Sequence, residues 1–176
     1  MNSNWKKRFL IIYAGQAFSL LGSAAVQFAI IWWLTVQTES AITLTVASIV
    51  GFLPTMLIGP FAGVWIDRYN RRTVMIAADG LVALSSVILG AVFLYVEAPP
   101  IWFIYIILFV RGLGNTFHAP AMQAAIPLLV PPDMFTKVGG WSSLVTSIST
   151  MLGPVLGAAL MGIVPIASIM LVDIFG

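Results

Sequence analysis

The sequence predicts an all-α integral membrane protein, and three features of its composition and patterning support this fold class. Hydrophobic residues make up 60% of the 176 residues, above the roughly 45–50% of a soluble domain. Charged residues make up only 8%, and the mean hydropathy is +1.04. The apolar residues form long runs, and a run of about 18 or more is a candidate membrane span. Too little polar sequence remains to cover a surface facing water.

The first apolar run covers about residues 9–36. It follows three cations, Lys6, Lys7 and Arg8. Secretory signal peptides also begin with cations, but their apolar core has only about 7–15 residues and ends at a small-residue cleavage site. This run instead continues through Trp32 and Trp33. We therefore predict a transmembrane helix with an interfacial aromatic pair at its far end.

Further apolar runs follow, each bounded by charged residues, proline or glycine. They cover about residues 41–66, 73–96, 101–126 and 140–163. At 1.5 Å per residue, each can cross a hydrocarbon core of about 30 Å with some tilt. A last run, residues 165–176, is too short to cross. We expect a single transmembrane domain over residues 1–176, with the sixth helix truncated.

The cations of the loops predict the orientation of the protein, because Lys and Arg are in excess on the cytoplasmic side of a membrane. Besides the amino terminus, cations occur in the second and fourth loops, as Arg68, Arg71, Arg72 and Lys137. The first and third loops carry only the acidic residues Glu39 and Glu97. The cations therefore lie on one side of the membrane, at the amino terminus and in every second loop, so we predict a cytoplasmic amino terminus.

Several function classes are not expected. The sequence has no nucleophile elbow, zinc-protease helix, phosphate-cradling glycine loop or zinc-ligand spacing. It has no cysteine, and so no disulfide or thiolate metal site. Its net charge is +2, but the cations lie at the ends of apolar runs, where membrane orientation explains them better than nucleic acid does. We expect no enzyme, catalytic residue, cofactor, metal or nucleic-acid partner.

Polar residues of the first predicted helix lie on one face. They are Gln16, Ser19, Ser23 and Gln27, at intervals of three, four and four. Lipid disfavours such groups, so the face either packs against other helices through hydrogen bonds or lines an aqueous cavity. Both alternatives stay open, and Gln16 and Gln27 are candidate cavity residues.

The fourth predicted helix carries polar residues at intervals of four and three positions, which are Arg111, Asn115 and His118. Arg111 lies about ten residues from the outer end of the run, near the middle of the membrane. An arginine there costs roughly 2.5–3.5 kcal/mol on insertion scales and faces a bundle interior or an aqueous path. The three residues are candidates for a substrate cavity. Alternatively, Arg111 is structural and binds backbone carbonyls or a carboxylate, and His118 is a packing histidine. Asp173 lies at a similar depth in the last run.

Rows of small residues follow the second and fifth predicted helices. They are Gly51, Thr55, Gly59 and Gly63, then Ser142, Thr146, Ser149, Gly153 and Gly157. Such rows let helix backbones approach closely. Pro54, Pro60 and Pro154 interrupt the same helices, which suits a bundle that moves. Asp79, on the third helix, lies about two turns from the loop arginines. We expect it to be their partner, and proton carriage is the alternative.

The segment GVWIDRYNRR, residues 63–72, resembles the signature between the second and third helices of the major facilitator superfamily. The matching residues are Gly63, Asp67, Arg68, Arg71 and Arg72. In that family the aspartate and the arginines form a latch at the cytoplasmic face that contacts helix ends of the other half. The resemblance implies a cytoplasmic gate here, to which we add Asp79. Asn70 stands where the family often has a second glycine.

Other segments agree with this resemblance. Arg111 with the following GLGNTFHAPA looks like the fourth-helix arginine motif of these transporters. STMLGPVLGAAL is similar to the fifth-helix motif of drug/proton antiporters, keeping Gly153, Pro154 and Gly157, with Ser149 for its first glycine. AGQAFSLLGSAAVQFAIIWWLT, VGFLPTMLIGPFAGVWIDR and FHAPAMQAAIPLLVPPDMFTK, with the later GP segment, together resemble bacterial macrolide efflux proteins. The resemblance covers nearly the whole chain.

The resemblance implies the amino-terminal six-helix half of such a transporter, with an incomplete sixth helix and the second half absent. It implies proton-coupled export of antibiotics, macrolides in particular, across the bacterial cytoplasmic membrane, and so a role in antibiotic resistance. The implied partners are the lipid bilayer, a small amphipathic drug, protons and the carboxy-terminal half of the same transporter. The alternatives are transport of another solute on the same fold, or a truncated membrane remnant that transports nothing.

Overall fold

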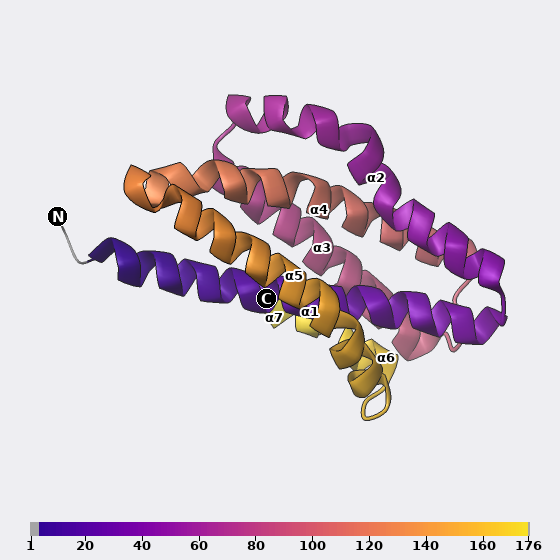
Figure 1. Ribbon diagram of the computed structural model, residues 1–176. Helices are drawn as coiled ribbons and strands as arrows, with labels where there is room; N and C mark the ends of the chain where they lie inside the picture. Colours follow the sequence, from indigo (N-terminus) through magenta and orange to yellow (C-terminus); the bar gives the residue numbers. More distant parts are fainter. Residues whose placement is uncertain (1–3, 176) are drawn as a thin grey trace.

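The computed structural model describes residues 4–175, and every regular element in that range is a helix (Figure 1). In chain order these are α1 (Asn4–Thr38), α2 (Ala41–Arg68), α3 (Arg71–Tyr95), α4 (Ile101–Leu129), the 3-10 helix η1 (Pro132–Met134), α5 (Phe135–Met161), α6 (Ile166–Ile169) and α7 (Val172–Phe175). Five of them are long and apolar enough to cross a membrane. The all-α membrane fold class is therefore confirmed over the described residues.

The long helices coincide with the complete apolar runs of the sequence, with ends that differ by a few residues. α1 continues past residue 36 to Thr38, and α5 begins at Phe135 instead of near residue 140. The sixth segment is present but is not one helix, because a turn at residues 170–171 separates α6 from α7. Gly176, the expected limit of this segment, lies outside the described residues.

Short polar side chains define where two of the long helices begin. The side chain of Ser40 accepts a hydrogen bond from the backbone N–H of Thr43 at 3.4 Å and caps α2. The side chain of Asn70 accepts from the backbone N–H of Arg72 at 3.0 Å and caps α3. Capping satisfies backbone donors that have no partner within the helix. Asn70, which replaces a family glycine, therefore sets the start of α3.

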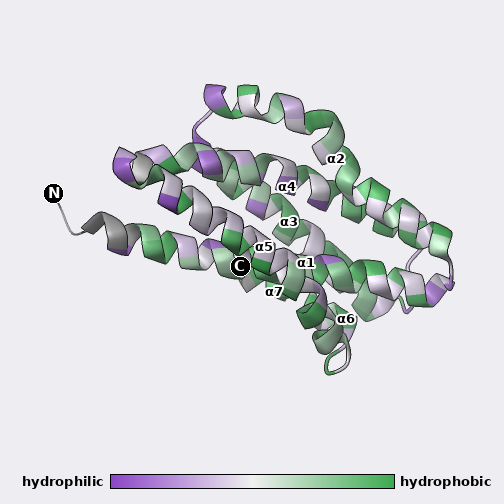
Figure 2. Cartoon of the chain, viewed as in Figure 1, coloured by the Kyte–Doolittle hydropathy of each residue, from purple (hydrophilic) through white to green (hydrophobic). Residues whose placement is uncertain are grey.

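The outer surface of the long helices is apolar. Large hydrophobic side chains are strongly exposed along them, such as Met56 on α2 (72%) and Met151 on α5 (75%). Figure 2 shows hydrophobic residues along the helices and hydrophilic residues gathered at the turns between them. A water-soluble monomer does not expose contiguous apolar surface on this scale. The protein is a multi-pass membrane protein.

The helices pack in pairs around a common core. The most extensive contacts join α1 to α5, α2 to α4, and α3 to α4, whereas α6 and α7 cover α1 and α3. The main hydrophobic core lies toward one end of the bundle. Its largest fully buried members are Ile30, Leu34, Leu89, Ile104, Leu108, Ile169 and Met170. α6 also contacts α5, whereas α2 packs mainly on α4 and α1.

Proline bends the second helix. Figure 1 shows α2 changing direction near its middle, so that its second half diverges from the first. Pro54 and Pro60 lie within α2, and proline removes a backbone hydrogen bond and clashes with the preceding turn. The bend sets the position of the turn between α2 and α3 relative to the rest of the bundle.

The small-residue rows serve as packing seams over part of their predicted length. A Cβ added to Gly153 on α5 would lie 2.5 Å from the Cβ of Ala24 on α1, and one added to Gly112 on α4 would collide with the carbonyl oxygen of Gly51 on α2. By contrast, a Cβ at Gly63 would meet nothing within 4 Å. The seam predicted along α2 therefore does not extend to Gly63.

Candidate functional site

A groove of about 470 Å³ lies between α1, α2, α4 and α5. Its apolar wall includes Leu20, Phe28, Ile31 and Phe52. Its polar wall includes Gln27, Ser48, Thr55, Asn115, Thr146 and Thr150. Sites for small molecules are concave and mostly apolar, with volumes of roughly 300–1,000 Å³ and a few polar groups that fix orientation. The groove has the size and chemistry of such a site.

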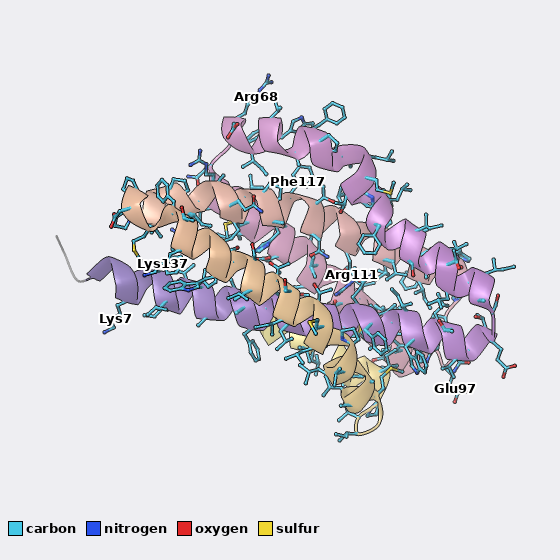
Figure 3. The ribbon with its side chains drawn as sticks, viewed as in Figure 1. Lys7, Arg68, Glu97, Arg111, Phe117 and Lys137 are labelled. Carbon is cyan, nitrogen blue, oxygen red and sulfur yellow. The ribbon has the colours of Figure 1, made fainter. Side chains whose placement is uncertain are left out.

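The structure brings some of the predicted cavity residues to this groove and separates others from it. Gln27, Asn115 and His118 line the groove. Gln16, two turns earlier than Ser23 on α1, lines a different cavity near the turn between α2 and α3. Arg111 does not line the groove, because its side chain is 0% exposed. It is the largest fully buried side chain among the described residues. Figure 3 shows Arg111 within the bundle, between the ends marked by Lys7 and Glu97.

Arg111, on α4, is held by groups from three other helices. Its Nη1 forms an ion pair with Asp173 Oδ2 of α7 and donates to Ser86 Oγ of α3. Its Nε donates to Gln27 Oε1 of α1 at 3.1 Å, and its Nη2 donates to the backbone oxygen of Ser23 at 3.3 Å. We call these five residues the Arg111–Asp173 network. It connects α1, α3, α4 and α7.

Asp173 is as fully satisfied as its partner. Ser23 Oγ donates to Asp173 Oδ1 at 2.6 Å, and Ser86 Oγ donates to Asp173 Oδ2 at 2.5 Å. The side chains of Arg111 and Asp173 are both 0% exposed. A buried ion pair persists only where its remaining donors and acceptors are also bonded. The structure thus joins the two charges that the sequence placed at similar depth, and Arg111 binds a carboxylate.

A second pair of ionisable side chains, Asp79 and His118, joins α3 to α4. His118 Nε2 lies 3.3 Å from Asp79 Oδ1, with His118 9% exposed and Asp79 46% exposed at the side chain. The two atoms are close but are not aligned as a hydrogen bond, so Nε2 has no hydrogen-bond partner among the described residues. The structure therefore places Asp79 beside His118, and over residues 4–175 it forms no ion pair with an arginine of the loop.

The charged turn between α2 and α3, residues 67–72, is here called the arginine turn. Asp67 and Arg68 end α2 with exposed side chains, and Figure 3 shows Arg68 pointing away from the bundle. Asp67, Arg71 and Arg72 line a cavity of about 900 Å³ together with Gln16 and Asp79. We call it the turn cavity. Within the described part of the chain, no ion pair involves the arginine turn.

The predicted antiporter-type motif lies on the contact between α1 and α5. Cβ atoms added to Gly153 and Gly157 would lie 2.5 Å from Ala24 Cβ and 2.6 Å from the backbone oxygen of Ala25. Pro154 lines the groove. The two glycines therefore pack against α1 within this set of helices, and the proline between them faces the groove.

Sequence reasoning placed Ser23 on a polar face but did not include Ser86 or Thr116 among the candidate site residues. Ser86 bonds to both charges of the Arg111–Asp173 network, and Thr116 shares a 2.9 Å hydrogen bond with Thr55 that joins α4 to α2. A usable signal was present for Ser86, because it lies seven residues after Asp79 and so on the same face of α3. Thr116 has no such signal, since its hydroxyl also bonds back to Gly112 of its own helix.

Comparisons with known proteins agree with this arrangement. The chain is 43% identical to Macrolide efflux protein A of Streptococcus pyogenes over 99% of this chain and 43% of that protein. It is 40% identical to Macrolide efflux protein A of Enterococcus faecalis over 73% of this chain and 40% of that protein. An uncharacterised MFS-type transporter of Bacillus subtilis is 25% identical over 98% of this chain and 39% of that protein. The chain thus spans less than half the length of these relatives.

No solved structure matches the chain significantly. The sequence profile of the Major Facilitator Superfamily matches residues 12–175, which include most of α1, all of α2 to α5, the arginine turn and the Arg111–Asp173 network. The match therefore covers nearly the whole chain and not one motif. This match, together with 43% identity to a relative over 99% of the present chain, shows that the chain belongs to the Major Facilitator Superfamily.

Proposed function

We propose that these residues form part of a proton-coupled efflux transporter that exports an antibiotic, a macrolide, from the bacterial cytoplasm. The groove of about 470 Å³ between α1, α2, α4 and α5 carries this proposal. The 43% identity to Macrolide efflux protein A supports the choice of substrate. Family membership favours a transporter over an enzyme. Export in exchange for protons is supported by the fifth-helix motif around Gly153.

The charge of the groove suits an amphipathic weak base. A macrolide carries a basic amine, and an exposed arginine at mid-depth would repel its protonated form. Arg111 does not act in this way, because Asp173 compensates its charge and its side chain is buried. The aromatic rings of Phe28 and Phe52, with the amides of Gln27 and Asn115, offer an apolar surface and a few hydrogen-bonding groups instead.

The proposed transporter lies in the cytoplasmic membrane with a cytoplasmic amino terminus. Figure 3 shows Lys7, Arg68 and Lys137 toward one end of the bundle and Glu97 at the other. The side chains of Lys6 and Arg8 are outside the described ones. The excess of cations at one end supports an orientation with that end in the cytoplasm.

The arginine turn is the proposed gate at that end. Asp67 lies in the last turn of α2, where the helix dipole disfavours a negative charge. A partner elsewhere in the transporter, such as the amino end of a helix in the carboxy-terminal half, would stabilise the carboxylate when the cytoplasmic side is closed. Breaking that contact would accompany opening.

The test is erythromycin susceptibility in an efflux-deficient bacterium that expresses the full-length reading frame, with and without a protonophore. We expect resistance that the protonophore abolishes. Unchanged susceptibility, with the protein shown in the membrane by immunoblot, would contradict macrolide export. A panel of other solutes would then identify what the same fold transports.

A further inference from the structure

The two pairs of ionisable side chains inside the bundle differ in how fully their polar atoms are hydrogen-bonded. In the Arg111–Asp173 network, Asp173 accepts from Ser23, Ser86 and Arg111 and is 0% exposed at the side chain. In the second pair, Asp79 is 46% exposed and lies 3.3 Å from His118 without an aligned hydrogen bond. Protonating Asp173 would leave a buried arginine uncompensated. Protonating the Asp79–His118 pair removes no such compensation.

The Asp79–His118 pair lies where three spaces adjoin. A cavity of about 30 Å³ is lined by Asp79 and His118 with Ser19, Ser23, Asn115 and Asp173. This space accommodates about one water molecule, and its polar lining suits one. His118 also lines the groove, and Asp79 also lines the turn cavity. The pair therefore connects the proposed drug site with the end of the bundle that carries the arginine turn.

We propose that Asp79 and His118 together form the site in this set of helices that takes up and releases the transported proton. This inference rests on the proposed function as a proton-coupled exporter. A proton from water outside the cell binds to the imidazole or the carboxylate, and the same proton later passes to cytoplasmic water. Only O–H and N–H bonds form and break. Uptake changes the pair from a net charge of −1, a carboxylate beside a neutral imidazole, to zero.

The charged groups around the Asp79–His118 pair leave it as the pair that can exchange a proton. The charged groups that face it are Asp173, which shares the small cavity and is held by Arg111, and Asp67, Arg71 and Arg72, which share the turn cavity. α1 lines all three spaces and α5 lines the groove, and both contribute only uncharged side chains. Gln16 Oε1, in the turn cavity, is buried with no hydrogen-bond partner in the described part of the chain. A donor such as water would satisfy it and would give Asp79 a path to solvent.

The first arm of the test needs no drug. The full-length transporter is reconstituted with isotope-labelled histidine, and the His118 resonance is identified by its loss in His118→Gln. His118 is the single histidine of these 176 residues. We expect its resonance to shift with pH across the range near neutrality in which histidine exchanges protons, and Asp79→Asn to change that pH dependence. A resonance constant over that range, or a pH dependence that Asp79→Asn does not change, would overturn the inference.

The second arm measures coupling. Erythromycin transport into proteoliposomes is compared with and without an imposed pH gradient, and the ratio of the two rates is the readout. We expect Asp79→Asn and His118→Gln each to reduce the stimulation by the gradient at least tenfold, and Asp79→Glu to restore much of it. Glu97→Gln, an exposed carboxylate at the opposite end of the bundle, serves as the control and should keep the wild-type ratio.

The outcomes separate the two proposals. Wild-type stimulation in both neutralised variants would overturn the inference and leave macrolide export intact. No erythromycin movement by the wild-type protein would contradict the proposed function. In that case the histidine titration still decides whether the pair exchanges a proton, because it requires no substrate.

Discussion

Arg111 shows how one residue can be both unfavourable and necessary inside a membrane. Its charge is removed from water completely. The ion pair with Asp173 and the hydrogen bonds that Arg111 donates to Ser86, Gln27 and Ser23 replace its hydration. A pair of this kind adds little net stability relative to apolar residues of the same volume, but loss of one partner exposes the full penalty of burying the other. Its role is to fix the relative positions of α1, α3, α4 and α7.

Replacing Arg111 with alanine should destabilise the protein by about 3–5 kcal/mol, because Asp173 would remain buried without its cation. The measurement is thermal unfolding of the full-length protein in detergent, together with its abundance in the membrane. Arg68→Ala removes an exposed arginine and is the matched control. A melting temperature for Arg111→Ala equal to that of the control would show that the network does not stabilise the fold.

At the scale of elements, close backbone contacts hold the helix pairs together. α1 packs on α5 through Gly153 and Gly157, and α2 packs on α4 where Gly112 meets Gly51. In lipid, helices gain little from burying apolar side chains against each other, so close packing and hydrogen bonds supply the association. The Thr55 to Thr116 hydrogen bond at 2.9 Å adds to the contact between α2 and α4.

Gly157→Ala should separate α1 from α5, because the new Cβ would lie 2.6 Å from the backbone oxygen of Ala25. Backbone cannot move aside as a flexible side chain can, and overpacking of this kind typically costs about 1–3 kcal/mol. Gly139→Ala, on the same helix with nothing within 4 Å, is the matched control. Thermal unfolding of the two variants compares them directly. Equal stability would mean that the seam between α1 and α5 is less tight than the structure shows.

The sequence predicted the long helices because their signal is local, and it predicted their contacts less well because contacts depend on rotation and register. Length and hydropathy sufficed for α1 to α5. The pairing of Arg111 with Asp173 joins residues 62 positions apart, and the position of Asp79 beside His118 depends on how α3 is rotated against α4. The break between α6 and α7 had no proline or glycine at residues 170–171 to indicate it.

At the scale of the whole molecule, the asymmetry of charge and the groove suit one side of an alternating-access transporter. The groove lies between α1, α2, α4 and α5, while α6 and α7 do not line it and pack mainly on α1 and α3. Ligand sites of these transporters lie at the interface between repeats near the bilayer midplane. If the proposed function is correct, we expect the polar groups of the groove to face a second set of helices.

Asp67→Asn should leave membrane insertion intact and impair efflux. The proposed gate at the arginine turn would lose the negative charge of Asp67, while the helices keep their apolar surface. The expected result is a loss of erythromycin resistance in cells at wild-type protein abundance. Glu97→Gln removes a carboxylate at the opposite end and should have no effect. Full resistance in the Asp67→Asn strain, with equal abundance, would remove the latch role from this residue.

The orientation in the membrane can be tested by introducing single cysteines and labelling them, because these 176 residues contain no cysteine. Lys137→Cys and Glu97→Cys lie toward opposite ends of the bundle (Figure 3). In intact cells we expect a membrane-impermeant maleimide to label the cysteine at position 97 and to spare that at 137, which should react only after permeabilisation. The opposite pattern would invert the topology.

The Arg111–Asp173 network also has a consequence for the order of biosynthesis. The arginine is translated 62 residues before its carboxylate, so at about 5–20 residues per second the ribosome takes roughly 3–12 s to supply the partner. During that interval we expect the fourth helix to carry a cation that lacks its carboxylate, and translation of the sixth segment then supplies Asp173. The pairing of the fourth helix with the rest of the network therefore depends on residues that are synthesised well after it.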